Sequence, residues 1–541
     1  MDGLIMDYQL NVPAILRRGE QLFGDKEIVT RLPDRSWHRY TYAEFAPRAR
    51  RLAAALRKEL GLGDGDRVAT FCWNHHQHLE AYVGVPTGGM VTHTLNLRLH
   101  PDDLVYIATH AHDRVLIADK VLWPMCETFF ERAGFEHLVA IGDGPTPEGA
   151  IEYEDLLASG EPDDLPGREI DEREAAAMCF TSGTTGRPKG AVYSHRAIAI
   201  HSLASAMAGV LSITEKDTVL PVVPMFHANA WGFPFTCTLV GAKQVLPGPC
   251  LDPESLLEAF ARERVTVTAG VPTIWMGILA ALDADPAKYE LSSLRCMIVG
   301  GSAAPQSMIE AFEQRHGLHV LHAWGMTETC PLGSVSDLTS RELALPEDEQ
   351  YRYRAKQGIP APFLEIRARG ADGLVPWDGE TMGELEVRGV WVSSAYHESP
   401  EAADRWTDDG WFKTGDVVTI EPHGYIEVRD RAKDLVKSGG EWISSVALEN
   451  ALMGHPAVAE AAVIAVPDPK WQERPLAVVV LKEGASAAPE ELRTHLAPHF
   501  VKWWLPDRFE FVDEIPKTAV GKFKKRALRE QFAARPVGTL S

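Results

Sequence analysis

The sequence predicts an α/β protein with a large N-terminal part built on parallel sheets, a β-rich subdomain and a small α+β C-terminal domain. Three observations predict this fold class. Between residues 67 and 300, short apolar runs alternate with helical stretches, which is typical of parallel sheets covered on both faces. From about residue 360, such runs alternate with Gly-rich turns, which indicates antiparallel strands. A length of 541 residues also exceeds one hydrophobic core, so at least two domains are expected.

In the N-terminal part, Thr41 and Glu44 have the spacing of a capping box and predict the start of a helix. Asp252 followed by Pro253 predicts a second helix start, because Asp caps the free N–H groups and Pro fits the first helical position. The predicted strands are residues 67–72, 90–95, 115–119, 138–141, 175–180, 218–223, 242–246, 265–269 and 297–299.

The C-terminal part differs from the rest in charge. From Arg431 onward there are 16 Lys and Arg against 14 Asp and Glu, whereas the preceding residues carry 38 against 62. We therefore expect an N-terminal domain over residues 1–430 and a mobile C-terminal domain over residues 431–541. The elements predicted here are strands in 364–369, 383–388 and 417–428, a helix over 446–453, strands at 458–466 and 476–481, and a helix over 489–497.

Composition excludes several classes of function. A net charge of −22 argues against a general nucleic-acid binder. The seven cysteines are scattered without a CxxC pair, which favours buried thiols in a reducing, cytoplasmic compartment over a disulfide framework or a zinc site. Residues 218–242 lack charged side chains, but their prolines and glycine predict a buried strand, turn and helix, with no transmembrane span.

A Gly-rich stretch, Thr181-Ser182-Gly183-Thr184-Thr185-Gly186-Arg187-Pro188-Lys189-Gly190, directly follows a predicted strand. Glycines let the backbone approach a ligand, while hydroxyls, N–H groups and cations attract phosphates. The spacing from Gly183 to Lys189 is that of a Walker A loop, but Pro188 and Gly190 replace two of its defining residues. The stretch therefore indicates a polyphosphate-binding loop of another kind.

Further motifs follow in a fixed order: 322–329 (HAWGMTET), 414–416 (TGD), 430–434 (DRAKD) and 516–522 (PKTAVGK). Together with the Gly-rich loop, this set resembles the signature motifs of the adenylate-forming superfamily, which includes acyl-CoA synthetases, firefly luciferase and nonribosomal peptide adenylation domains. Residues 220–231 and 437–444 most resemble bacterial long- or medium-chain fatty-acyl-CoA synthetases, to which methylmercaptopropionate-CoA ligases are related.

The resemblance implies a two-step reaction. A carboxylate attacks the α-phosphorus of ATP to give acyl-AMP and pyrophosphate, and the thiol of CoA then releases AMP. The implied cofactor is Mg²⁺, with ATP and CoA as cosubstrates. Glu328, with Thr184, is implied to hold the metal, and Thr327 to contact the α-phosphate.

The resemblance also implies an ATP/AMP site. Asp416 follows Thr414-Gly415, which predicts a turn just after a strand, and its carboxylate is expected to accept the ribose hydroxyls. Trp324 occupies the position where the family commonly has an adenine-stacking Tyr. The implied ATP/AMP-binding residues are Thr181, Ser182, Gly183, Thr184, Thr185, Gly186, Lys189, Gly301, Ser302, Ala303, His322, Trp324, Gly325, Met326, Thr327, Asp416, Arg431, Lys433, Lys437 and Lys522.

By the same resemblance, Lys522 is the catalytic lysine of the first half-reaction, and residues 430–435 form a hinge about which the C-terminal domain rotates. After rotation, residues 437–444 would face the site, with Gly439, Gly440 and Trp442 lining the CoA arm. An exposed charge pair is the alternative for Lys433 and Lys437.

His227 and Trp231 are four residues apart and would share a face if this segment is helical. The resemblance implies that His227 lies at the carboxylate and acts as a third catalytic residue, with Lys522 and Thr327, while Trp231 gates an acyl tunnel. A core His and a core Trp are the alternative. Without an Asp in residues 226–231, an amino-acid substrate is disfavoured.

The predicted function is that of a fatty acid–CoA ligase. A CoA ligase for a short-chain, thioether or aryl acid is the alternative, and a luciferase-type oxygenase or a nucleotide-binding regulator on an inactive scaffold are more remote. Loss of Lys522 or Glu328 would favour the regulator, but both are present. The expected partners are a carboxylic acid, ATP and CoA, with no nucleic acid and no transmembrane span. Some relatives of this branch are dimers, so a homodimer is also an expectation.

Overall fold

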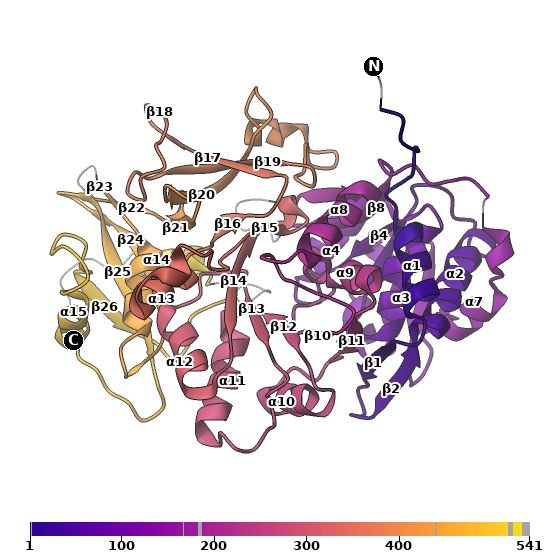
Figure 1. The fold of residues 1–541 in the computed structure, drawn as a ribbon, viewed down its shortest axis with the longest axis horizontal. Helices are drawn as coiled ribbons and strands as arrows, with labels where there is room; N and C mark the ends of the chain where they lie inside the picture. Colours follow the sequence, from indigo (N-terminus) through magenta and orange to yellow (C-terminus); the bar gives the residue numbers. More distant parts are fainter. Residues whose placement is uncertain (2, 166, 182–186, 439–440, 518–522, 533–541) are drawn as a thin grey trace.

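The computed structural model describes residues 1, 3–165, 167–181, 187–438, 441–517 and 523–532, and its fold confirms the predicted α/β class (Figure 1). Two large sheets form the N-terminal part. A separate antiparallel sheet and a compact C-terminal α+β unit follow them along the chain.

In the part of the chain that the structure describes, the first sheet has seven strands in the order β7-β6-β5-β3-β4-β8-β9. Neighbours pair in parallel, except that β8 and β9 are antiparallel. The strands are β3 (Arg67–Phe71), β4 (Val91–Thr94), β5 (Asp113–Asp119), β6 (His137–Ile141), β7 (Ile151–Glu152), β8 (Ala175–Phe180) and β9 (Gly190–Ser194).

The second sheet, counted over the same described ranges, has nine strands in the order β16-β15-β14-β13-β12-β10-β11-β1-β2. Its centre is parallel, whereas β2, β15 and β16 add antiparallel edges. The strands are β1 (Glu27–Arg31), β2 (Trp37–Thr41), β10 (Thr218–Pro221), β11 (Lys243–Leu246), β12 (Val267–Gly270), β13 (Cys296–Val299), β14 (Val320–Gly325), β15 (Leu332–Val335) and β16 (Ile359–Pro360).

A shared helical layer lies between these sheets, because one apolar cluster contains residues of both sheets and of the helices between them. The inner helices are α1 (Val12–Phe23), α2 (Tyr42–Lys58), α3 (His76–Thr87), α8 (His195–Ala206) and α9 (Phe233–Val240). Next to them, α7 (Tyr153–Ser159) packs on α2 and the seven-stranded sheet.

Separate apolar clusters cover the outer faces of the two sheets. The seven-stranded sheet is covered by α4 (Pro101–Ala111), α5 (Trp123–Cys126) and α6 (Phe130–Ala133). The nine-stranded sheet is covered by α10 (Pro253–Arg262), α11 (Pro272–Ala284), α12 (Gln306–His316) and α13 (Glu347–Ala355). Short 3-10 turns complete the N-terminal part at η1 (Lys120–Leu122), η2 (Pro162–Asp164), η3 (Ala228–Gly232), η4 (Thr327–Thr329) and η5 (Glu342–Ala344).

The β-rich subdomain is an antiparallel sheet in the order β18-β17-β19-β20-β21. Its elements are β17 (Leu364–Gly370), β18 (Gly373–Leu374), β19 (Gly383–Gly389), η6 (Pro400–Arg405), β20 (Phe412–Ile420) and β21 (Ile426–Arg431). The C-terminal unit carries α14 and α15 on one face of its sheet and α16 on the other. Its elements are β22 (Val436–Ser438), β23 (Glu441–Ile443), α14 (Ser445–Met453), β24 (Val458–Asp468), β25 (Gln472–Leu481), α15 (Pro489–Leu496), β26 (Arg508–Phe511) and α16 (Lys525–Phe532).

The predicted local signals are confirmed at the helix starts. The Thr41 N–H donates to Glu44 at 2.8 Å, and Asp252 accepts the N–H of Ser255 at 2.9 Å. All seven cysteines are unpaired, and six are buried. Residues 218–242 contain β10, η3 and α9, as predicted. Among the described residues, we find no helix with the length and apolar character needed to cross a bilayer.

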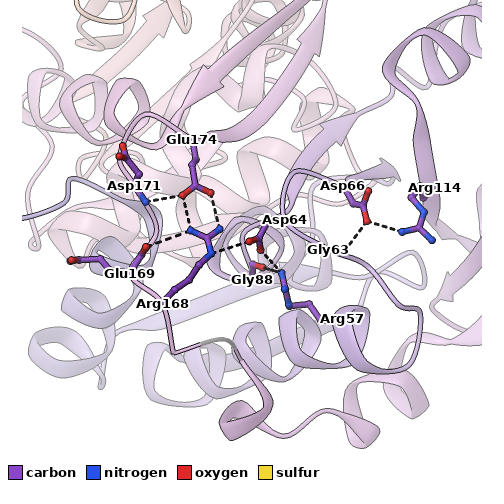
Figure 2. Close-up of polar contacts among 10 residues, drawn as sticks. All are labelled: Arg57, Gly63, Asp64, Asp66, Gly88, Arg114, Arg168, Glu169, Asp171 and Glu174. Atoms are coloured by element: carbon purple, nitrogen blue, oxygen red, sulfur yellow. Dashed lines mark hydrogen bonds and ion pairs between the residues drawn. The ribbon is translucent and has the colours of Figure 1, made fainter.

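The segment that leads into β8 is held by exposed ion pairs (Figure 2). Arg168 contacts Glu174 at 2.7 Å and Asp64 at 2.9 Å, and Asp64 also contacts Arg57, at the end of α2, at 2.7 Å. Burial would raise the pKa of Asp64, but Arg168 and Arg57 lower it on balance. These contacts tie the approach to β8, and hence to the Gly-rich loop, to the end of α2.

Candidate active site

The Gly-rich loop begins and ends at one point. The Thr181 N–H donates to Lys189 O at 2.9 Å, and the Lys189 N–H donates to the Thr181 hydroxyl at 3.1 Å. Next to this closure, the Arg187 guanidinium lies 5.0 Å from the centroid of the Tyr106 ring. Strands β8 and β9 therefore bring the two ends of the loop together, with two cationic side chains at the β9 end. The predicted Ser182, Gly183, Thr184, Thr185 and Gly186 lie outside the described residues.

Glu328 and Thr327 are buried in η4. The Tyr396 hydroxyl donates to Glu328 Oε1, and the Tyr193 hydroxyl donates to the carbonyl of Thr327 at 2.6 Å. The Lys189 ammonium lies 5.9 Å from the centroid of the Tyr396 ring. The structure thus brings a cation of the Gly-rich loop and the carboxylate of a motif far along the chain to the same tyrosine.

Asp416 forms the centre of a second cluster. Its side chain is buried, with one oxygen 2.7 Å from Arg431 Nε and the other accepting the Trp324 indole N–H at 3.0 Å. The Asp416 N–H donates to the Thr414 hydroxyl at 3.1 Å. Sequence reasoning expected Asp416 on a turn after a strand, and this was wrong. It lies inside β20, where the pairing with β19 is irregular and Gly415 has a φ of 76°.

The 322–329 motif (HAWGMTET) spans the end of β14 and the turn η4. Its residues have different surroundings. Burial lowers the pKa of His322 to about 4, while hydrogen bonds with backbone groups, including Ala355 O at 2.9 Å, oppose the shift. His322 is therefore neutral near pH 7 and supports the backbone. Gly325 has no room for a side chain, because an added Cβ would lie 1.8 Å from Pro331 O. The Met326 N–H donates to the same carbonyl at 3.0 Å.

A shared helical face for His227 and Trp231 required this segment to be an α-helix, and the structure shows that it is not. Ala228, Asn229, Ala230 and Trp231 all have φ between 44° and 55°, so they form a left-handed turn. L-residues with positive φ are strained, and such strain persists where the surroundings impose it. The turn is followed by Gly232, where an added Cβ would lie 2.6 Å from the His201 ring.

This left-handed turn directs the Trp231 ring to the glycines after β13. A Cβ added to Gly300 would lie 2.9 Å from the Trp231 ring, and one added to Gly301 would lie 4.0 Å from it. The segment predicted to contact the base is therefore next to the side chain predicted to gate the acyl tunnel. Of the other residues predicted there, Ser302 is exposed and Ala303 is half-buried.

His227 lies at a small cavity beneath the start of the Gly-rich loop, lined in part by Thr181, Thr94 and Asn96. The cavity also reaches Cys179 and Phe226. The structure thus brings His227 close to the start of the loop, through the end of β8 and the turn that follows β10.

The C-terminal residues that were predicted to belong to the site differ in whether they contact Asp416 or Glu328. Arg431 reaches Asp416, as described above, and Lys433 follows it on an exposed turn. Lys437 and Trp442 are register partners in the hairpin of β22 and β23, and both are exposed. No hydrogen bond or ion pair between described residues joins these two side chains to Asp416 or Glu328. Gly439, Gly440 and Lys522 lie outside the described residues.

Two groups of residues merit testing as metal sites. Glu328 has one oxygen held by Tyr396, and no described residue donates to the other, so the carboxylate suits a hard cation such as Mg²⁺. Cys72, His75 and Asp119 also lie within 4.8 Å of one another. Their polar atoms are already engaged, however. His75 bonds to Asp119 at 2.7 Å and caps α3 at its other nitrogen, and the Cys72 thiol donates to a backbone carbonyl. This second group has a structural role.

Sequence reasoning missed Tyr396 and Tyr193. Both are buried, and each touches η4 from a strand or loop far away in the sequence. An isolated tyrosine in a polar loop or at the end of a strand carries no periodic or motif signal. Only its contact with η4 marks it as part of the site.

Comparisons with known proteins agree with this geometry. The family described as AMP-binding enzyme matches residues 16–397, and the family described as AMP-binding enzyme C-terminal domain matches residues 447–522. A long-chain-fatty-acid–CoA ligase of Thermus thermophilus is 51% identical over 98% of this chain and 96% of its own length. A 3-methylmercaptopropionyl-CoA ligase of Ruegeria lacuscaerulensis is 43% identical over 98% of this chain and 99% of its own.

One solved structure of a CoA ligase is similar to this protein over nearly the whole chain. The crystal structure of an anthranilate CoA ligase in complex with anthranoyl-AMP superposes with a TM-score of 0.86 at 26% identity, over 97% of this chain and 98% of its own. The family matches include the Gly-rich loop, η4, strands β17 and β19 of the sheet that holds Asp416, and part of the C-terminal unit. The chain therefore belongs to the adenylate-forming family of AMP-binding enzymes.

Proposed function

We propose that this protein is an ATP-dependent fatty acid–CoA ligase. In the first half-reaction a fatty carboxylate displaces pyrophosphate from ATP, forming acyl-AMP. In the second, the thiol of CoA attacks the acyl carbonyl and releases AMP. The observation that carries the proposal is a pair of contact clusters built on the 322–329 motif: Lys189 and Glu328 meet at Tyr396, and Asp416 is held by Trp324, in a chain whose relatives are acid–CoA ligases.

The Asp416 cluster supports AMP binding. Its carboxylate is held at both oxygens by Trp324 and Arg431, and each oxygen retains a lone pair for a ribose hydroxyl. The Trp324 indole is fixed by its hydrogen bond to Asp416, which orients the ring for contact with the adenine. Gly301, Ser302 and Ala303 would approach the base from its other side, where small residues leave space.

Glu328, Thr327 and Lys189 support the binding of the triphosphate. ATP and the substrate carboxylate are both anionic, so the site must supply cations and donors that act as charge moves to the leaving pyrophosphate. Glu328, with Thr184, would hold Mg²⁺, and the bound ion would neutralise phosphate charge. Lys189 lies over the ring of the tyrosine that bonds to Glu328, and it would contact the phosphates directly.

Two half-reactions require two arrangements of the site. We place residues 431–541 in a mobile domain that presents Lys522 to the carboxylate and α-phosphate first, and the Lys437–Trp442 hairpin with Gly439 and Gly440 to CoA afterwards. We expect Lys522→Ala to abolish acyl-AMP formation but to retain thioester formation from supplied acyl-AMP. Equal loss of both half-reactions would contradict this role.

The acyl chain would enter beside His227 and Trp231. Trp231 closes the space next to Gly300 with a large apolar ring, which suits an alkyl chain better than a charged substrate. A thioether acid is the alternative, because a relative with 43% identity is a 3-methylmercaptopropionyl-CoA ligase. Short-chain and aryl acids remain further alternatives on the same scaffold.

The test is CoA-dependent release of AMP over a panel of acids: straight chains of graded length, 3-methylmercaptopropionate and benzoate. A maximum of kcat/KM at medium or long straight chains supports the proposal. A maximum at the thioether or aryl acid would replace the fatty substrate but keep the ligase reaction. Pyrophosphate release without any CoA-dependent product would overturn the ligase assignment, and absence of both would favour a nucleotide-binding regulator.

A cytoplasmic location and a homodimer complete the proposal. Seven unpaired cysteines are compatible with a reducing compartment. Light scattering of the purified protein at several concentrations would test the homodimer, and a mass of 59.6 kDa per particle would contradict it.

A further inference from the structure

The strongest unassigned feature next to the candidate site is the environment of Tyr396. Its hydroxyl donates to Glu328 Oε1, although the two residues are 68 positions apart in the sequence. Tyr396 is 9% exposed and Glu328 is 5% exposed, so water does not compete freely for this hydrogen bond. A charge-assisted hydrogen bond of this kind is stronger than one between neutral groups.

The tyrosine itself is held on the opposite side. The Trp406 ring packs edge-on against Tyr396 at a centroid distance of 5.2 Å, and the Trp406 indole N–H donates to Ser393 O at 2.8 Å. The Ser393 N–H in turn donates to the backbone carbonyl of Glu328 at 2.8 Å. The segment from Ser393 to Tyr396 therefore fixes both the backbone and the carboxylate of Glu328.

The arrangement leaves one carboxylate oxygen for a ligand. Oε1 accepts the hydrogen bond from Tyr396, while no described residue donates to Oε2. The Lys189 ammonium lies over the face of the same ring, 5.9 Å from its centroid. Displacement of Tyr396 would thus alter the position of the carboxylate and of the cation together.

We propose that Tyr396 is a positioning residue that orients the Glu328 carboxylate toward the metal ion carried by ATP. The inference rests on the proposed role of Glu328. Residues that hydrogen-bond to a metal ligand restrict its rotation, and their loss typically costs 10- to 100-fold in metal affinity or activity.

The test compares Tyr396→Phe with the unaltered protein in Mg²⁺ titrations. The first readout is the calorimetric affinity for an ATP analogue with an α,β-methylene bridge, measured over a series of Mg²⁺ concentrations. We expect the Mg²⁺ midpoint to rise about 10-fold in Tyr396→Phe. The second readout separates the half-reactions: acid-dependent ATP–pyrophosphate exchange should fall, while thioester formation from supplied acyl-AMP should stay within about twofold, in keeping with an effect confined to the metal-dependent step.

Tyr153→Phe is the matched control. Tyr153 is also buried and donates to a buried glutamate, Glu80, at 2.7 Å, but it lies on α7 away from the site. It should leave the Mg²⁺ midpoint unchanged. If both variants raise the midpoint equally, the effect is one of general stability and the inference is overturned.

Glu328→Gln separates the inference from the function on which it rests. If Glu328→Gln raises the Mg²⁺ midpoint and Tyr396→Phe does not, the role of Tyr396 is overturned and the metal role of Glu328 stands. If neither variant changes the midpoint, the metal role of Glu328 itself fails. In the double variant with Glu328→Gln and Tyr396→Phe, the second substitution should raise the Mg²⁺ midpoint by less than a further twofold. The effects of two residues that act through one another are not additive.

A second variant covers the case in which Tyr396→Phe does not fold. Trp406→Phe keeps the tyrosine hydroxyl but removes the indole N–H that holds Ser393. We expect a smaller rise in the Mg²⁺ midpoint, of about threefold, below the 10- to 100-fold typical when a residue bonded directly to a metal ligand is lost. An unchanged midpoint in this variant would overturn the inference.

Discussion

Two clusters of charged side chains join distant parts of this chain, and they differ in exposure. At the approach to β8, Arg168 bridges Asp64 and Glu174, with side chains that are 35%, 45% and 34% exposed (Figure 2). At the start of the C-terminal unit, Lys525 contacts Glu449 at 2.6 Å, with side chains that are 10% and 8% exposed. The first cluster is screened by water and salt, whereas the second is not.

The buried cluster contains more acid than base. Asp430 accepts the Ser445 N–H at 2.7 Å, and Lys525 also contacts the Ser445 hydroxyl. Burial raises the pKa of Asp430, and it raises the pKa of Glu449 to about 7 against the opposing attraction of Lys525. Burial would lower the pKa of Lys525, but the two carboxylates raise it on balance. One ammonium cannot neutralise two buried carboxylates, so the cluster takes up a proton near neutral pH.

Ion pairs of similar geometry therefore differ in their consequences for stability. An exposed ion pair can hold a segment in place, but its loss changes the free energy of unfolding little, because water solvates the charge that loses its partner. A buried pair that loses one partner leaves a charge in an apolar environment. The stability of the C-terminal unit is therefore sensitive to mutation of these residues and to pH.

The largest effect is expected from Lys525→Met. Removal of the cation leaves Asp430 and Glu449 buried without it, and breaking a buried pair typically costs about 3–5 kcal/mol. Urea denaturation followed by tryptophan fluorescence would measure the loss. The double variant Lys525→Met with Glu449→Leu should recover at least half of it, because an apolar pair tolerates burial. A loss below about 1 kcal/mol in the single variant, the size typical of an exposed pair, would remove the contrast between the two clusters.

The second prediction concerns pH. Because the folded pKa of Glu449 is raised above its ordinary value, its contribution to stability is fully present below about pH 4.5 and is lost as the pH rises through about 7. The total is about 3 kcal/mol, since one pKa unit corresponds to about 1.4 kcal/mol. Hydrogen exchange of α14 should therefore speed up from pH 5 to pH 8 beyond the intrinsic chemical rate. In Glu449→Gln this additional slope should disappear, and an unchanged slope would contradict the assignment.

A smaller effect is expected from Gly160→Ala, which tests the packing of the segment before Arg168 against α2. An added Cβ would lie 2.1 Å from the carbonyl oxygen of Arg51. Overpacking typically costs about 1–3 kcal/mol. Thermal unfolding would measure the change, with Gly167→Ala as a control, because a Cβ there meets nothing within 4 Å. Equal effects of the two substitutions would show that this contact does not constrain the segment.

The smallest effect is expected from Arg168→Ala. Exposed ion pairs contribute about 0.2–1 kcal/mol, and salt screens them. The difference in Tm from the unaltered protein should shrink as NaCl is added. A loss of stability comparable to that of Lys525→Met, or one independent of salt, would show that exposure does not determine how much these ion pairs contribute to stability.

Much of the fold could be predicted because its signals are local. The alternation of apolar runs and helical stretches placed β3 to β6, and the apolar run before the Gly-rich loop coincides with β8. The helix starts at Thr41 and Asp252 rely on side chains bonding to the backbone three residues away. Such signals survive without tertiary information, because both partners lie within one turn of the chain.

The failures occurred where long-range packing overrides local preference. A spacing of four residues suggested a helical face for His227 and Trp231, yet the surroundings impose a left-handed turn ending at Gly232. Asp416 follows a Thr-Gly pair that is typical of turns, but pairing with β19 and β21 keeps it in a strand. Both exceptions lie at the candidate site, where function commonly departs from local preference.

The sequence by itself determined the fold class, the order of the motifs and the family to which they point, because these depend on residue types and spacing. Only the tertiary structure decided that Lys189 and Glu328 meet at Tyr396, that Asp416 is held by Trp324 and Arg431, and which of the two charged clusters is buried. Those facts depend on contacts between residues tens to hundreds of positions apart. No local pattern encodes such contacts, since they arise when separate sheets and helices pack against one another.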